Sequence, residues 1–148
     1  LMQESSIDTL IKTVIPAATL LTPNIPEAEK ISEMKITTPE DMREAAKKIY
    51  EMGAGAVLVK GGHYIGDARD ILFDGREFHT YVEKRIDTKN THGTGCTLSS
   101  AIASYLALGE PLPEAVGKAK AYVTGAIEHA LALGNGCGPT NHFFRWWN

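Results

Sequence analysis

The sequence predicts an α/β fold, and three observations support that prediction. Two short apolar runs, residues 17–21 and 56–59, have the length and composition of buried parallel strands. Between them, Thr38-Pro39 opens a helical pattern with a cap and a proline at the first position. A glycine-containing loop at residues 90–95 then leads directly into another helical pattern. Strands and helices that alternate along a chain are typical of α/β domains.

The elements between these landmarks follow from local signals. Pro16 stops an opening helix. Thr22-Pro23-Asn24 turns the first strand into a helix with Pro26 in its first turn. Gly53 or Gly55 ends the helix that Thr38 starts. The apolar stripes of the four longer predicted helices are Ile7, Leu10, Ile11 and Val14; Met42, Ala45, Ala46 and Ile49; Leu98, Ala101, Ile102 and Tyr105; and Ala119, Tyr122, Val123, Ala126, Ile127 and Ala130.

The second half of the chain adds a hairpin and a helical pair. Asp74-Gly75 is a strong hairpin signal between runs 69–73 and 77–82, which predicts an antiparallel edge on a mostly parallel sheet. Residues 109–113 predict a turn and a new helix start, and Gly134 is expected to close that helix.

Composition excludes several classes of function. The chain has 148 residues, enough for one domain with a core; 43% are hydrophobic, 22% are charged and the net charge is −3. No basic cluster predicts nucleic-acid binding, and no apolar run reaches the ~20 residues of a membrane span. The two cysteines and the absence of a secretory segment favour a cytoplasmic protein. The five histidines show no spacing typical of a zinc site.

The most informative stretch is residues 90–101. Gly93-Thr94-Gly95 precedes a helical pattern, so glycine backbone and a helix N-terminus would together offer N–H donors to an anion, most simply phosphate. Cys96 would lie beside that site, where the thiolate is favoured. The alternative is a loop that caps an ordinary buried helix, with Cys96 as a small core residue.

Four motifs together resemble the ribokinase-like superfamily, in its hydroxymethylpyrimidine kinase branch. They are residues 90–100, 22–29, 57–63 and 136–142, and in order and spacing the resemblance extends over nearly the whole chain. Most of the superfamily has aspartate at the position of Cys96, whereas the pyrimidine kinases and some pyridoxal kinases have cysteine. Cys137 departs from the branch, in which histidine is more usual. The resemblance implies a three-layer αβα sandwich, of which residues 1–148 would be the C-terminal nucleotide- and phosphate-binding portion, with the N-terminal half absent.

The resemblance also implies roles for particular residues. The catalytic set would be Gly93, Thr94, Gly95 and Cys96, with Cys96 facing the substrate hydroxyl where relatives have the aspartate base. ATP would be bound by Lys60, Gly61, Gly62, Asn24, Thr91 and Val123. Glu27 would place Mg²⁺ together with Asn24, partly through water. Read from the residues alone, Glu27 is equally well explained as a first-turn acid that complements the helix dipole.

The implied function is ATP-dependent phosphorylation of hydroxymethylpyrimidine and its monophosphate in thiamine biosynthesis. Pyridoxal is the alternative substrate within the same branch. A different class of function is a non-catalytic nucleotide-binding half, because members of the branch are about twice this length and recognise the pyrimidine mainly through their N-terminal half. The expected partners are the small-molecule substrate and a second copy of the full-length enzyme, with neither nucleic acid nor membrane.

Overall fold

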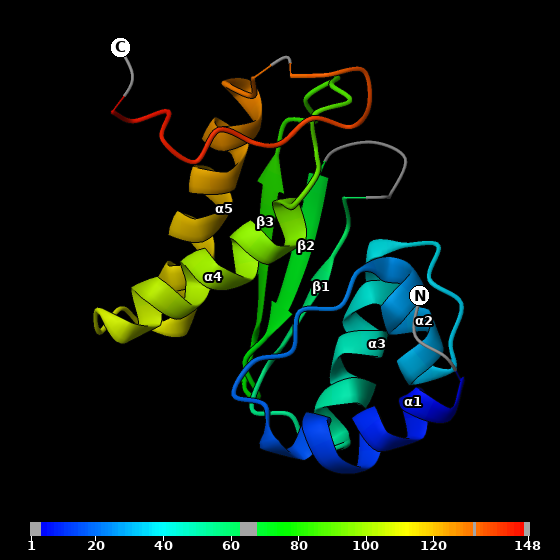
Figure 1. Ribbon diagram of the computed structural model, residues 1–148. Coiled ribbons are helices and arrows are strands. Elements are labelled where there is room, and N and C mark those ends of the chain that lie inside the picture. Colours follow the sequence, from blue (N-terminus) through cyan, green and yellow to red (C-terminus); the bar gives the residue numbers. More distant parts are fainter. Residues whose placement is uncertain (1–3, 63–67, 132, 147–148) are drawn as a thin grey trace. The chain divides into compact units, whose positions relative to one another are not determined.

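The computed structural model describes residues 4–62, 68–131 and 133–146. The chain divides into two compact units, Leu1–Val82 and Glu83–Asn148. Helices and strands occur together, as an α/β class requires (Figure 1). No helix in these described ranges is long and apolar enough to cross a membrane.

The first unit is built around a small sheet. Its strands are β1 (Val57–Lys60), β2 (Ala68–Phe73) and β3 (Phe78–Glu83), in the order β1-β2-β3. β1 runs antiparallel to β2 in a register that places Lys60 opposite Asp70. The predicted hairpin is confirmed: Asp74 and Gly75 form the turn between β2 and β3, and Gly75 has the positive φ of +92° that such turns require.

Two capped helices pack on this sheet. The helix α3 (Pro39–Glu51) contacts both β1 and β2, and α2 (Ile25–Ser32) packs on α3 and β1 (Figure 1). A capping box opens each helix, formed by Asn24 with Glu27 and by Thr38 with Asp41. The predicted stripe of α3 is buried, with Met42, Ala45, Ala46 and Ile49 at most 1% exposed. The predicted end is also observed, because Gly53 follows the helix at φ +111°.

The expected buried strand at residues 17–21 is only partly present. The chain opens with α1 (Glu4–Thr9), the π-helical turn η1 (Leu10–Val14) and the 3₁₀ turn η2 (Ile15–Ala17), so Ala17 is helical and exposed. Pairing with β1 begins at Leu21, which forms a parallel bridge with Val57, and resumes where Asn24 pairs with Lys60. Pro23 has no N–H to donate, which interrupts the ladder between these bridges.

The second unit contains a helical pair and a tail. The helices α4 (Thr94–Ala107) and α5 (Leu112–Glu128) pack through Leu98 and Ile102 of α4 and buried residues of α5. The expectation that Gly134 closes α5 is wrong, since the helix ends at Glu128 with His129 as its cap. The carbonyl of Ala126, which would continue the helical ladder, instead accepts a 2.9 Å hydrogen bond from the Asn141 N–H. The tail thus bonds to the last turn of α5, where the helical ladder stops.

Candidate functional site

The start of α4 has an unusual backbone. Gly93 is the N-cap and adopts the left-handed conformation, with φ +83° and ψ 1°. The first helical hydrogen bond runs from the Thr97 N–H to the Gly93 carbonyl at 2.9 Å, and the Thr97 hydroxyl donates to the same oxygen at 2.8 Å. This carbonyl is therefore held firmly. A residue with a Cβ would be strained at position 93, because glycine alone adopts this φ freely.

Helix initiation leaves donors without acceptors. The Thr94 N–H reaches the Thr91 carbonyl only at 3.4 Å. Within the described ranges, the N–H groups of Gly95 and Cys96 have no hydrogen-bond acceptor. Unpaired N–H groups and the positive end of the helix dipole favour an anion at this point. The predicted catalytic segment, residues 93–96, therefore begins a helix and has donors available for a phosphoryl group.

A cavity of about 700 Å³ opens beside this helix start. Gly93 and Cys96 line it, together with one face of α4, Tyr122 of α5 and part of the tail, including His142 and Arg145. Cys96 is exposed and its thiol is free of any disulfide. The site thus combines backbone donors, an accessible sulfur and a hollow that can hold a small organic molecule.

In the first unit, the fold brings Asn24 and Lys60 together. They form a parallel bridge, and the Lys60 N–H donates to the Pro23 carbonyl at 2.8 Å. Asn24 accepts a hydrogen bond from the Glu27 N–H at 2.9 Å, and the Glu27 carboxylate accepts one from the Asn24 N–H at 2.8 Å. Glu27 therefore has the structural role that the sequence left open. It is also exposed, and its other carboxylate oxygen has no hydrogen bond to a described residue.

The two glycines after Lys60 differ in the space available around them. A Cβ on Gly61 would lie 2.0 Å from the Arg69 carbonyl oxygen, whereas one on Gly62 would meet no atom within 4 Å. The Gly61 N–H donates to the carboxylate of Asp70 at 2.9 Å, and Asp70 is 5% exposed. Asp70 thus holds the backbone of Gly61 in place, immediately after β1 ends at Lys60. Sequence reasoning missed it, because its proximity to Gly61 depends on the register of β1 and β2.

Two predicted nucleotide contacts lie in different surroundings. Thr91 is exposed in the loop before α4, while Val123 is 9% exposed within α5. Val123 does not line the cavity, but its neighbour Tyr122 does. His63 lies outside the described residues. Tyr122 had no signal in the sequence beyond its place in a helical stripe.

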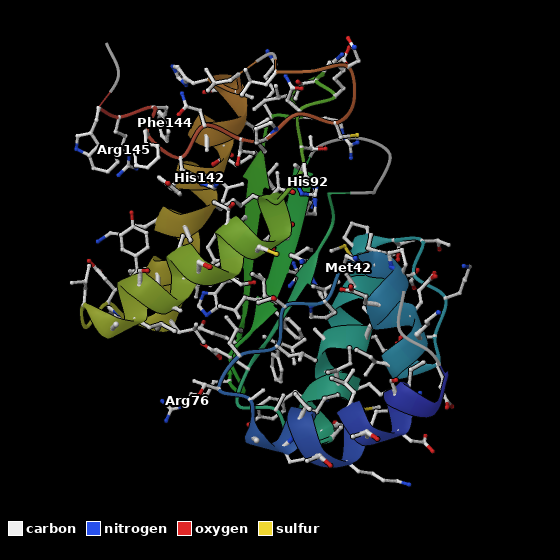
Figure 2. The ribbon with its side chains drawn as sticks, viewed as in Figure 1. Met42, Arg76, His92, His142, Phe144 and Arg145 are labelled. Atoms are coloured by element: carbon white, nitrogen blue, oxygen red, sulfur yellow. The ribbon has the colours of Figure 1, made fainter. Side chains whose placement is uncertain are left out.

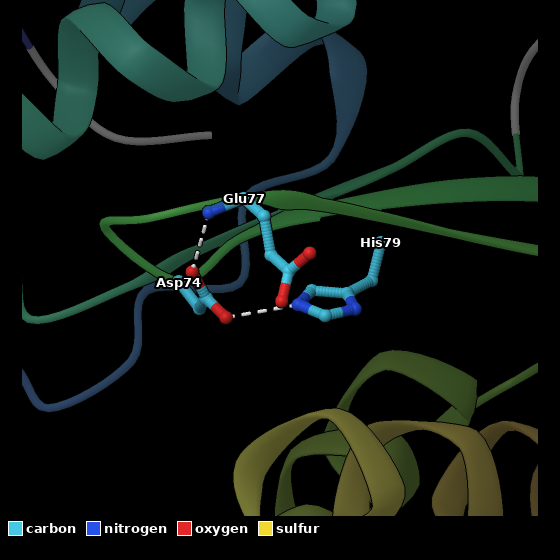
Figure 3. A group of neighbouring side chains, drawn as sticks. All are labelled: Asp74, Glu77 and His79. Carbon is cyan, nitrogen blue, oxygen red and sulfur yellow. Dashed lines mark hydrogen bonds and ion pairs between the residues drawn. The ribbon is translucent and has the colours of Figure 1, made fainter.

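One further polar group forms at the hairpin turn. Asp74, Glu77 and His79 each have one atom that could bind a metal ion, a carboxylate oxygen or a ring nitrogen, and these atoms lie within 4.8 Å of one another (Figure 3). One Asp74 oxygen accepts from the N–H groups of Arg76 and Glu77, and the other lies 2.9 Å from Nε2 of His79. The Glu77 N–H and then His79 lower the pKa of Asp74 to about 2. Both oxygens are already used in the turn, so we assign the group to hairpin stability.

Comparison with known proteins identifies the family. The model of the phosphomethylpyrimidine kinase family matches residues 1–141. The chain belongs to that family. The resemblance found in the sequence motifs is thereby confirmed.

Relatives of the phosphomethylpyrimidine kinase family match at high identity. The thiamine biosynthesis bifunctional protein ThiED of Geobacter sulfurreducens is 53% identical over 96% of this chain and 29% of its own length. The hydroxymethylpyrimidine/phosphomethylpyrimidine kinase of Streptomyces coelicolor is 43% identical over 96% of this chain and 53% of its own length. This chain therefore spans about half, or less, of these relatives.

A solved structure of an ADP complex of Bacillus subtilis pyridoxal kinase matches the fold. It superposes with a TM-score of 0.93 at 38% identity, covering 100% of this chain and 58% of that one. The predicted fold class, an α/β ribokinase-like sandwich present here as its C-terminal portion, is thereby confirmed.

Proposed function

We propose that this chain is the phosphoryl-binding portion of an ATP-dependent kinase that phosphorylates hydroxymethylpyrimidine and its monophosphate in thiamine biosynthesis. The observation that supports this most directly is the start of α4, where unpaired N–H groups and an exposed thiol adjoin one cavity. Phosphoryl transfer depends mainly on positioning and charge neutralisation, which such donors supply. The name of the Streptomyces relative supports the pyrimidine as acceptor, and the name of the Geobacter relative supports a place in thiamine biosynthesis.

In this proposal Gly93, Thr94, Gly95 and Cys96 act on the transferred group. The N–H groups of Gly95 and Cys96 hold the phosphoryl oxygens, and the left-handed Gly93 sets their direction. As a thiolate, Cys96 would face the acceptor hydroxyl and accept its proton, becoming a thiol, as that oxygen attacks the phosphoryl group and ADP leaves. Cys96 is exposed and lines the cavity, and this supports the proposed role.

Further residues are proposed to contact the nucleotide. Lys60 supplies positive charge, Gly62 leaves room for close approach of the nucleotide, Gly61 holds the strand exit beside it, and Thr91 and Val123 border the base. The open space around Gly62 is consistent with a ligand at that point. The ADP bound to the pyridoxal kinase of similar fold supports an adenine nucleotide as the phosphoryl donor.

Asn24 and Glu27 are the proposed Mg²⁺ residues, and their chemistry fits the ion. Mg²⁺ keeps several waters and is typically held by one or two carboxylates together with substrate phosphates. Glu27 is exposed and has an oxygen without a protein hydrogen bond among the described residues. When bound, the ion would neutralise charge on the nucleotide phosphates.

Pyridoxal is the second candidate acceptor, favoured by the TM-score of 0.93 to a pyridoxal kinase. The test is steady-state kinetics of the full-length polypeptide with ATP and each alcohol. We expect kcat/KM for hydroxymethylpyrimidine to exceed that for pyridoxal at least tenfold. A reversed ratio would assign the chain to pyridoxal, and no turnover of either alcohol would contradict the kinase proposal.

A non-catalytic nucleotide-binding role is the alternative of a different class. The only support for it is the length of the match, since the chain spans 53% of the Streptomyces enzyme.

We further propose that the full-length enzyme is a homodimer in the cytoplasm.

A further inference from the structure

The loop that precedes α4 is held by the tail of the chain. We define the anion loop as residues 90–93 and the tail as residues 136–146. The His92 N–H donates to the Gly138 carbonyl at 3.2 Å, and the Gly138 N–H donates to the Asn90 side chain at 3.1 Å. His92 and Pro139 also pair as a parallel bridge. Both ends of residues 90–92 are thus bonded to a single glycine of the tail.

The contact between loop and tail allows little freedom. Asn90 is 8% exposed, and a Cβ on Gly138 would lie 2.4 Å from its side-chain oxygen. The approach at Gly138 is therefore possible only for glycine. Any displacement of the tail at this point must move the Asn90 side chain or break its hydrogen bond.

The tail is in turn anchored to α5. The Asn141 N–H donates to the Ala126 carbonyl at 2.9 Å, and the Tyr122 hydroxyl donates to the His142 carbonyl at 2.9 Å. Phe144 lies in the tail beside α5 (Figure 2). Its ring lies against two rings of the same helix region, with centroids 5.7 Å from Tyr122 and 5.2 Å from His129. These contacts extend over the end of α5.

Gly125 provides the notch in which Phe144 is seated. A Cβ at this position would lie 2.5 Å from the Phe144 ring. Glycine within a helix is less favourable than alanine, so its presence inside α5 has a packing explanation: the ring occupies the space that a methyl group would fill. Arg145 lies over both rings, with its guanidinium carbon 5.3 Å from the Tyr122 centroid and 5.6 Å from that of Phe144.

We propose that Phe144, seated at Gly125, is a positioning residue for the anion loop. It anchors the tail, and the tail fixes Asn90 and His92 through Gly138, immediately before the left-handed Gly93. Phe144 does not line the cavity, whereas Arg145 and Trp146 do, so it acts through the loop and not on a ligand. This role rests on the proposed function, because the position of the loop matters for activity only if the N–H groups of Gly95 and Cys96, which follow it, bind the phosphoryl group.

The experiment is a double-mutant cycle in the full-length polypeptide with Gly125→Ala and Phe144→Ala. Each single variant should lower kcat roughly ten- to hundredfold, because displacement of catalytic groups by about 1 Å can cost about 10²-fold. The KM values for ATP and the alcohol should change less than about threefold. The double variant should be no slower than Phe144→Ala, because alanine has room at position 125 once the ring is gone.

The thermal midpoint separates positioning from stability. In the Phe144→Ala background, Gly125→Ala should hold or raise the midpoint through helix propensity, while kcat stays low. Phe143→Ala is the matched control, since Phe143 is a neighbouring aromatic residue that is 57% exposed and outside the cavity. It should leave kcat within about twofold of the parent. If Phe144→Ala does not fold, Phe144→Leu provides the same comparison.

Hydrogen exchange tests the anchor without any turnover. Amides in peptides spanning residues 88–95 should exchange at least tenfold faster in Gly125→Ala and Phe144→Ala than in the parent or Phe143→Ala. Unchanged exchange would overturn the proposal, and so would faster exchange with unchanged kcat. If the parent phosphorylates neither alcohol, the proposed function fails while the exchange data still decide whether the tail fixes the loop.

Discussion

Cys96 is the side chain on which the proposed chemistry depends most directly. Its thiol is exposed and lines the cavity at the start of α4. In the full-length polypeptide we expect Cys96→Ala to lower kcat by about 10²–10⁴-fold, the usual contribution of a general base, while nucleotide affinity is kept. Cys96→Asp should retain part of the activity, because a carboxylate can accept the same proton.

The control for this prediction is Cys137→Ala. Cys137 is also exposed and free but does not line the cavity, so its loss should leave kcat within about twofold of the parent. The measurements are steady-state rates with hydroxymethylpyrimidine and ATP, and nucleotide binding by calorimetry. Near-normal turnover of Cys96→Ala would reduce the residue to a packing role.

At Glu27 the effect of the negative charge can be tested separately from the capping role of the side chain. Glutamine serves a capping box as glutamate does, so Glu27→Gln should keep the hydrogen bond to the Asn24 N–H and the thermal midpoint. Loss of the charge should raise the Mg²⁺ concentration needed for half-maximal rate at least tenfold. The measurement is a Mg²⁺ titration of the rate in the full-length polypeptide.

Asp41 supplies the matched control for Glu27. It is the capping-box acid of α3 and accepts hydrogen bonds from Thr37 and Thr38, so Asp41→Asn should alter stability but not the Mg²⁺ titration. An unchanged titration in Glu27→Gln would leave Glu27 as a capping residue only.

Asp74 predicts a defined acid sensitivity. Its pKa falls from the ordinary value of 3.8 to about 2 in the folded state, mainly because the Glu77 N–H donates to it and then because of His79. A lowered folded-state pKa contributes stability that is fully present above pH 3.8 and is lost as the pH falls through about 2. Asp74→Asn should therefore flatten the fall in the free energy of unfolding across this window, whereas Glu77→Gln should not. Equal pH slopes for parent and Asp74→Asn in urea unfolding would contradict this assignment.

The exit of β1 can be tested as an element. Gly61→Ala would place a methyl group 2.0 Å from the Arg69 carbonyl oxygen, and overpacking of this kind costs roughly 1–3 kcal/mol. Gly62→Ala meets no atom within 4 Å and should leave the unfolding free energy within about 0.5 kcal/mol. Denaturant unfolding of both variants makes the comparison. If Gly62→Ala is as stable as the parent but has a higher KM for ATP, that rise indicates that the nucleotide approaches the backbone at Gly62. Equal stability of the Gly61→Ala and Gly62→Ala variants would contradict the steric explanation.

Elements with strong local signals were predictable. The Asp74-Gly75 turn, the Thr38 cap and the glycine-led start of α4 follow from residues within a few positions of one another. The failures arose where distant residues decide the outcome. The last turn of α5 is bonded by the Asn141 N–H of the tail, and the ladder beside β1 is interrupted at Pro23.

The same distinction, between features set by neighbouring residues and features set by distant ones, applies to the candidate site. The segment 93–96 was predictable, because glycine geometry and helix initiation are local properties of the sequence. Asp70 beneath Gly61 and Phe144 in the Gly125 notch were not, because each contact joins residues that only the folded chain brings together. Sequence motifs thus located the groups proposed to touch ligands and missed the residues that support them.

At the scale of the whole molecule, the activity should need more than these 148 residues. The chain spans 53% of the Streptomyces kinase, so we expect the isolated chain to bind AMP-PCP more weakly than the full-length polypeptide and to phosphorylate no alcohol. Calorimetry and a coupled assay on the isolated chain and on the full-length polypeptide make the comparison. Turnover by the isolated chain would show that its own cavity suffices for the acceptor.

The notch at Gly125 also restricts the order in which this part of the chain can change over generations. An alanine at position 125 collides with the Phe144 ring, so that exchange is disfavoured while the ring is present. If the ring is lost first, alanine becomes acceptable and even stabilises the helix. A later return of phenylalanine at position 144 would then meet a filled space. The order of the two substitutions therefore matters: once Phe144 has been replaced and alanine occupies position 125, phenylalanine can return at position 144 only after glycine has returned at position 125.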